Sequence, residues 1–467
     1  MRRTGGEGWA GRRLRRAASA LAPSLIVSAL ITLAWPLPGH AQDSQAPGDA
    51  SAAAAPEAFA WHVQATSVSQ GHLAFPAAFS GPNSLSAPAA GRTSNDITLY
   101  AGFRPWAGAE VWIDPELDQG FGMNDTLGVA AFPSGEAYKV GANTPYAKLP
   151  RLFLRQTLDL GGDSQGVDPD LNVLGGRRTP DRLVLWLGKF SVTDVFDANS
   201  LAHDPRNDFL NWALIDTATF DYAADAWGYT YGAAGEWYQG PWTLRAGLFD
   251  MSQVPNSPTL DDDFGQFQID AELERRFTLG GHDGAVRLTG FLTRARMGQL
   301  ADALRLGAAT GEAPETALVR HYASRGGVSL NAEQQLSEDL SLFLRAGLGD
   351  GHEEIYEFTD VDQTLAGGLS LAGKAWGRAD DRVGLAGAVN QISPLRQAYL
   401  AAGGLGILIG DGRLPKEAPE TLVETYYDWA AVKGVNLTLD YQFVTDPAYD
   451  PERGPVSVFA VRVHAQY

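Results

Sequence analysis

The sequence predicts an all-β fold, namely a transmembrane antiparallel β-barrel of about 16 strands. Segments of alternating apolar and polar residues recur from Trp61 to the end of the chain, separated by turn residues. The chain closes on such a segment, and its last residue is the aromatic Tyr467. The final strand of a membrane barrel pairs with the first strand and turns its apolar residues toward lipid. Short and long connections also alternate along the chain, as they do in outer-membrane barrels.

The N-terminal region predicts export. Residues 1–16 contain six arginines and one acid, an apolar run follows, and small residues precede an expected cleavage after Ala41. This pattern is typical of a secretory signal peptide, here residues 1–41. Residues 42–58 are rich in Ala, Ser, Pro and Asp, and we expect them to form a flexible leader. The β-barrel would then occupy residues 59–467.

The strands are predicted from the period-two pattern. In the segment 435–443, Val, Leu, Leu, Tyr and Phe fall on one face and Asn, Thr, Asp and Gln on the other. Sixteen such segments are expected, at residues 60–69, 97–104, 108–114, 151–160, 182–190, 226–238, 242–249, 265–278, 285–296, 325–336, 339–349, 361–372, 382–391, 421–431, 435–444 and 456–467.

Two connections stand out. Outer-membrane barrels have short periplasmic turns and long extracellular loops, but residues 161–181 form a long connection where a short one is expected. The third long connection, residues 191–225, is expected to be a third extracellular loop that folds into the barrel.

Aromatic residues in the segment 226–238 predict the height of the lipid-facing band. Trp227, Tyr229, Tyr231 and Trp237 share one face of this predicted strand. Ten residues of strand span roughly 33 Å. At a tilt of about 40° this is about 25 Å along the barrel axis, the usual distance between two aromatic girdles.

Composition excludes several classes of function. Removal of residues 1–41 takes away six of the 36 basic residues and one of the 55 acidic ones, which changes the formal net charge from −19 to −24. Nucleic acid is therefore not an expected partner. The chain has no cysteine, so neither disulfides nor thiolate metal sites are expected. Beyond the signal peptide, no apolar run approaches the ~20 residues that a membrane helix needs.

Several segments resemble the carbohydrate-selective outer-membrane porins of the OprB type. They are residues 187–200 (LGKFSVTDVFDANS), 203–212 (HDPRNDFLNW), 220–229 (FDYAADAWGY), 247–250 (GLFD), 439–443 (LDYQF) and 453–459 (RGPVSVF). The resemblance extends from about residue 97 to residue 467. It implies a sixteen-stranded barrel that admits monosaccharides and related small solutes by diffusion through a narrowed pore. It does not imply which sugar is preferred.

Charged residues on the polar faces of the predicted strands are candidates for lining the pore. They are Arg104, Glu110, Asp114, Arg151, Arg155, Arg245 and Arg345, with Lys189 at the end of its strand. A lumen that carries both signs of charge offers fixed donors and acceptors to sugar hydroxyls. The alternative is that these residues only solvate a water-filled interior.

The connection 191–225 supplies the remaining candidates. They are Asp194, Asp197, Asp204, Arg206, Asp208 and Trp212. Aromatic rings beside carboxylates can bind a sugar, because the ring stacks on its C–H face while the acids bond its hydroxyls. Two alternatives are a surface loop whose aspartates cap turns and a calcium site. The spacing matches no EF-hand, and no metal or cofactor is expected.

These observations predict a passive, carbohydrate-preferring porin of a Gram-negative outer membrane. Sugars, membrane lipid and, through the C-terminal strand, the barrel-assembly machinery are the expected partners. No enzyme activity is expected, because no nucleophile elbow, zinc motif or phosphate loop is present. The alternatives are a general non-selective porin and a secreted soluble β-sheet protein that binds glycans.

Overall fold

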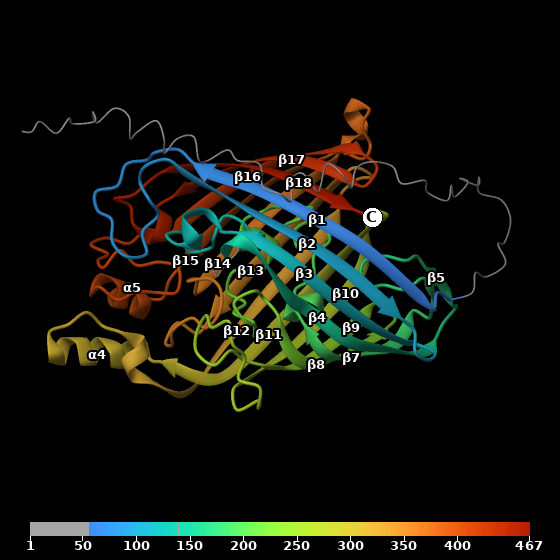
Figure 1. The fold of residues 1–467 in the computed structure, drawn as a ribbon, viewed down its shortest axis with the longest axis horizontal. Helices are drawn as coiled ribbons and strands as arrows, with labels where there is room; N and C mark the ends of the chain where they lie inside the picture. The colour runs from blue at the N-terminus through green and yellow to red at the C-terminus, as the bar shows by residue number, and fades with distance from the viewer. Residues whose placement is uncertain (1–55, 138–140) are drawn as a thin grey trace, which may run out of the picture. The chain divides into compact units, whose positions relative to one another are not determined.

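The computed structural model describes residues 56–137 and 141–467. The predicted signal peptide and residues 42–55 of the predicted leader lie outside these described residues. The described residues form a closed antiparallel barrel of sixteen strands, in which every strand pairs with its neighbours in the chain and the last barrel strand pairs with the first. The predicted fold class is confirmed (Figure 1).

The elements have the following bounds. The barrel strands are β1 (Phe59–His72), β2 (Ala90–Phe103), β3 (Ala109–Gly120), β4 (Ala142–Gly161), β7 (Asp181–Phe190), β8 (Thr230–Gln239), β9 (Trp242–Asp250), β10 (Phe267–Leu279), β11 (His282–Gly298), β12 (Arg320–Gln335), β13 (Leu340–Gly349), β14 (Gln363–Ala372), β15 (Arg382–Gln391), β16 (Glu420–Val432), β17 (Val435–Thr445) and β18 (Val456–Gln466). A separate two-stranded sheet consists of β5 (Gln165–Val167) and β6 (Gly176–Arg178). The helices are α3 (Trp212–Ile215), α4 (Leu300–Thr310) and α5 (Pro394–Ala401), with 3-10 turns η2 (Met123–Thr126), η3 (Val192–Asp194), η4 (Thr316–Val319), η5 (Gly373–Trp376) and η6 (Pro447–Tyr449).

The seam between β1 and β18 closes the barrel. Gln64 lies opposite Gln466, and the register continues without a shift to His72 opposite Val458. The backbone N–H of Tyr467 donates to the carbonyl of Val63 at 2.9 Å. The final strand therefore has the role that its alternating pattern predicts.

The two faces of the strands differ as expected for a membrane barrel. On β18, Phe459 and Val461 are 48% and 42% exposed, whereas the side chain of the next residue, Arg462, is fully buried. The same alternation on β10 exposes Ile269 and Leu273. The interior is not purely polar, however, because buried aromatic side chains such as Trp112, Phe249 and Phe343 belong to one apolar cluster.

The connections differ in length at the two ends of the barrel. Long ones occupy the end that carries α4 and α5, which we call the loop end, and short ones occupy the opposite turn end (Figure 1). The turn end includes the connections 104–108, 240–241, 280–281 and 433–434. The connection between β4 and β7 is the exception: it belongs to the turn end but is long and contains β5 and β6.

Only two of the four aromatic residues that were predicted to share the outer face of segment 226–238 lie there. Tyr231 and Trp237 are 46% and 47% exposed on the outer face of β8, as predicted. Trp227 and Tyr229 precede the strand, however, and Tyr229 is only 9% exposed. Asp225 causes this break, because its carboxylate and carbonyl bond the backbone of residues 227–229 in a turn.

None of the helices formed by the described residues is both long enough and apolar enough to cross a membrane.

Candidate functional site

The connection between β7 and β8, residues 191–229, contains more buried residues than any other connection in the described part of the chain, and we call it the third loop. It starts with a capping box, in which Ser191 and Asp194 bond each other's backbone N–H groups at the ends of η3. The side chain of Asn211 caps α3 by accepting the N–H of Ala213 at 2.9 Å. These local caps give the loop a defined shape.

Inward-facing side chains of distant strands bond the backbone of the third loop. The carboxylate of Glu424 on β16 accepts the N–H groups of Leu210 and Asn211. The guanidinium of Arg345 on β13 donates to the carbonyls of Ala202, Leu214 and Asp197. Because backbone groups are the partners, these side chains fix the path of the loop rather than one side chain of it.

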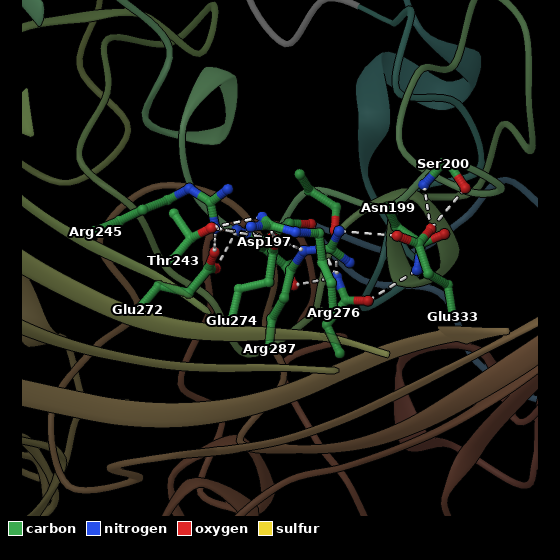
Figure 2. A network of polar contacts seen from close by, with 12 residues as sticks. Asp197, Asn199, Ser200, Thr243, Arg245, Glu272, Glu274, Arg276, Arg287 and Glu333 are labelled. Atoms are coloured by element: carbon green, nitrogen blue, oxygen red, sulfur yellow. Dashed lines mark hydrogen bonds and ion pairs between the residues drawn. The ribbon is translucent and has the colours of Figure 1, made fainter. Parts of the chain in front are cut away.

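A network of alternating charges connects β9, β10 and β11 to the same loop (Figure 2). Arg245 lies 2.7 Å from Glu272 and 3.0 Å from Glu274. Glu272 in turn accepts the backbone N–H of Asp197 at 2.8 Å.

The network extends to β12 through Arg287, which lies 3.0 Å from Glu274 and 2.8 Å from Glu333. Glu333 accepts both the backbone N–H and the hydroxyl of Ser200 at 2.7 Å. Figure 2 shows Ser200 meeting Glu333 at one end of this network. Charges of alternating sign neutralise one another, so the network holds the loop without leaving an unpaired charge.

A cavity of about 310 Å³ lies between the third loop and the wall formed by β2, β3 and β4, and we call it the central cavity. Its charged and aromatic lining includes Tyr100, Glu116, Glu136, Lys148, Arg151, Asp194, His203, Asp204, Arg206, Trp212, Asp216, Tyr222, Trp227 and Tyr229. Such a lining presents donors, acceptors and ring faces to the same space.

The cations of the central cavity are shared among several acids. Arg206 lies 3.1 Å from Glu136, 3.7 Å from Asp96 and 3.8 Å from Glu116. Lys148 lies 3.2 Å from Glu116. Each of these two cations is therefore shared among several carboxylates of the cavity wall.

Arg151 is held more tightly. Its guanidinium forms a bidentate pair with Asp194, at 2.8 and 2.6 Å. It also lies 5.0 Å from the centre of the Tyr229 ring, and Lys148 lies 5.5 Å from the same ring. Cations over an aromatic face are attracted to it, so these side chains keep one arrangement at the wall.

The third loop contains titratable groups with shifted pKa values. Burial would lower the pKa of His203, but the Asp216 carboxylate, 3.4 Å from the imidazole Nδ1, outweighs it and raises the pKa to about 9. Burial would raise the pKa of Asp204, but the Arg206 guanidinium holds it below its ordinary value. The loop is thus charged at neutral pH.

The structure places the predicted site residues in three groups. Arg151, Asp194, Asp204, Arg206 and Trp212 line the central cavity. Four residues are buried: Asp197 and Asp208 within the third loop, and Arg245 and Arg345 on the strands that hold it. Arg345 is therefore not the water-exposed lumen residue that the alternation predicted. Arg104, Glu110, Asp114 and Arg155 contact the connection between β4 and β7; Lys189 pairs with Asp225 at 3.1 Å.

Sequence reasoning missed Glu116 and Lys148 in the cavity wall. The predicted strands ended at residue 114 and began at residue 151, because Pro115 and Pro150 interrupt the pattern and proline rarely lies inside a strand. The structure carries β3 and β4 past both prolines, with a register shift between Asp114 and Glu116. Alternation resumed beyond each proline would have been the signal.

A closed barrel with an apolar outer face, a charged inner wall and an internal cavity defines an outer-membrane channel. The model of the family "Carbohydrate-selective porin, OprB family" matches residues 89–467, and the chain belongs to that family. It is therefore an outer-membrane porin for carbohydrates, and its family and fold are those of channels rather than enzymes.

The fold is similar to that of a solved porin structure. The structure of Pseudomonas putida OprB determined at high pH has a TM-score of 0.67 and 15% sequence identity, over 88% of this chain and 94% of that one. The channel DcaP of Acinetobacter baumannii has a TM-score of 0.49 and 11% identity, over 89% of this chain and 98% of that one. No curated protein sequence matches the chain.

Proposed function

We propose that this porin passes monosaccharides, such as glucose, by passive diffusion through the central cavity, and that the third loop folds inward to narrow its pore. The observation that supports this most is the lining of the cavity, where Arg151, Arg206 and Lys148 stand among carboxylates and aromatic rings. Guanidinium and carboxylate groups exchange hydrogen bonds with hydroxyls, and rings stack on the C–H faces of a pyranose.

The proposed mechanism is transport without chemistry. A solute enters when the wall replaces part of its hydration shell, and it leaves because each contact is weak and several are offered in succession. The paired charges suit this role, since a lone buried charge would either exclude neutral solutes or hold one too firmly. We propose no catalytic activity for the chain.

We further propose the partners that follow from the architecture. The exposed apolar residues of the strands would contact membrane lipid, and the C-terminal strand would be read by the barrel-assembly machinery. Residues 1–41 would direct export and be removed. The turn end of the barrel would face the periplasm and the loop end the exterior, as in other outer-membrane barrels.

Single-channel conductance in a planar bilayer, titrated with glucose, xylose and a disaccharide, tests the proposal. We expect stable ion-conducting steps that a monosaccharide blocks in a saturable way and that a disaccharide blocks less. Replacing Arg151 with Ala should weaken this block. Conducting steps that no sugar blocks would favour a general porin instead.

A further inference from the structure

The long connection at the turn end, residues 162–180, reaches back toward the centre of the barrel, and we call it the inserted hairpin. Its base is the β5–β6 pair, with Gln165 opposite Arg178. Its tip is closed by two backbone hydrogen bonds between Asp170 and Val173, at 3.0 and 3.1 Å. Asn172 at the tip has a φ of 55°, a left-handed conformation that asparagine tolerates in tight turns.

The tip is bonded to the inner wall of β3 and β4. The side-chain amide of Asn172 donates to the Asp114 carboxylate at 3.0 Å, and Arg155 donates to the carbonyl of Asn172 at 2.6 Å. Asp114 lies in the middle of β3, opposite Arg151 of β4. A connection that only turned the chain around at the barrel rim would not reach this position.

A second set of contacts fixes the flank of the tip. The backbone of Gly175 exchanges hydrogen bonds with Glu57: its carbonyl accepts the N–H of Glu57 at 3.0 Å, and its N–H donates to the Glu57 carboxylate at 2.7 Å. Arg104 donates to the carbonyls of both residues. Leu174 is only 1% exposed. The tip is thus held from both sides, whereas Arg177 at the base is exposed.

The tip also belongs to the wall of the central cavity. Leu171 and Asn172 line it together with Arg151 of β4 and Asp194 of the third loop. The central cavity is therefore bounded by the inserted hairpin, which comes from the turn end, as well as by the third loop, which comes from the loop end.

We infer that the inserted hairpin forms the periplasmic boundary of the sugar pathway and selects solutes by size, admitting a single pyranose and hindering a disaccharide. This inference rests on the proposed function. The third loop alone leaves the turn-end side of the cavity undefined, whereas the tip contributes both bulk, through Leu171, and a polar edge, through Asn172. Its bonds to Asp114 and Arg155 keep that edge in place while solute passes.

Substitutions of Leu171 test the inference in both directions. This side chain lines the cavity without making any of the tip's hydrogen bonds. Leu171→Trp adds volume and should lower single-channel conductance about twofold, and Leu171→Ala should raise it, because conduction depends on pore width. Replacement of residues 168–175 with two glycines should raise conductance further and increase disaccharide uptake relative to glucose in liposome swelling.

Arg178→Ala, also at the exposed base of the hairpin, is the matched control and should behave as the unmodified protein does. Unchanged conductance and unchanged sugar preference in both Leu171 variants would overturn the inference, even if the shortened hairpin fails to fold. If the unmodified porin shows no sugar block while the Leu171 variants change ion conductance, the hairpin still bounds the pore and the proposed sugar function fails. The two failures are therefore distinguishable.

Discussion

Replacing Arg345 with Met would test whether this residue anchors the third loop or contacts solute. The substitution keeps an unbranched side chain on β13 but removes the hydrogen bonds to the carbonyls of Ala202, Leu214 and Asp197. It also removes the charge 3.6 Å from the Asp197 carboxylate, and both side chains are fully buried. A buried acceptor that loses its partner has no water to replace it.

The expected magnitude follows from these contacts. Breaking one partner of a buried ion pair costs about 3–5 kcal/mol. Three orphaned carbonyls at about 1–3 kcal/mol each give a similar or larger figure before water enters the gap. A loss of about 3 kcal/mol changes the ratio of docked to released loop by more than about 100-fold. The third loop should therefore leave its place for a measurable fraction of the time.

The assay is single-channel recording combined with limited proteolysis of the reconstituted porin. Arg345→Met should give noisier and larger conductance steps and new cleavage within residues 191–229. Arg296→Met, on the exposed outer face of β11, makes the same chemical change without touching the loop and should alter neither. Quiet, unchanged steps and intact loops combined with weaker sugar block would refute the anchoring role and restore Arg345 as a solute-binding residue.

Three further predictions concern the third loop. The raised pKa of His203 adds about 3 kcal/mol of stability that is complete below pH 6.5 and is lost between pH 6.5 and about 9, so loop proteolysis should increase over that range and His203→Gln should abolish the dependence. Trp212→Ala should loosen the loop as well as weaken sugar block, because Trp212 stacks on Phe358 at 4.9 Å and is only 8% exposed; an unchanged cleavage pattern would show that the ring serves solute alone. Glu424→Gln should reduce thermal stability by about 1–3 kcal/mol, since the two carboxylate oxygens each accept one backbone N–H, whereas an amide has one acceptor oxygen and would turn its NH2 toward the other N–H; an unchanged melting temperature would contradict this reading.

The strands could be predicted because, in a lipid-facing barrel, every second residue of a strand faces lipid and is apolar. Segment 435–444 and strand β17 differ by a single residue at one end. The prediction of strands failed where a proline or a side-chain-capped turn, rather than contact with lipid, determined the local sequence. Pro115 interrupts the alternating pattern, so the continuation of β3 beyond it was not predicted. The turn around Asp225 places Trp227 before the strand and away from the lipid-facing surface.

The site was harder to predict than the barrel. Alternation tells which side chains point inward, but not which of them a loop later covers. Arg151 and Arg345 both lie on inner faces, yet one lines the central cavity and the other is buried under the third loop. That difference depends on pairings such as Asp197 with Arg345, which are distant in sequence and leave no periodic pattern. The inserted hairpin was visible only as a connection of unexpected length.

The seam between β1 and β18 has a consequence for biogenesis. It brings together residues as far apart as Thr66 and His464, whose side chains lie 3.1 Å from each other across 398 positions. Pairings of such long range come late and slowly in folding. Until the seam forms, both edge strands offer unpaired backbone groups that can join another chain. Nascent copies of this porin therefore need protection from aggregation until their last strand has reached the membrane, and loss of that strand would harm assembly far more than loss of any single loop.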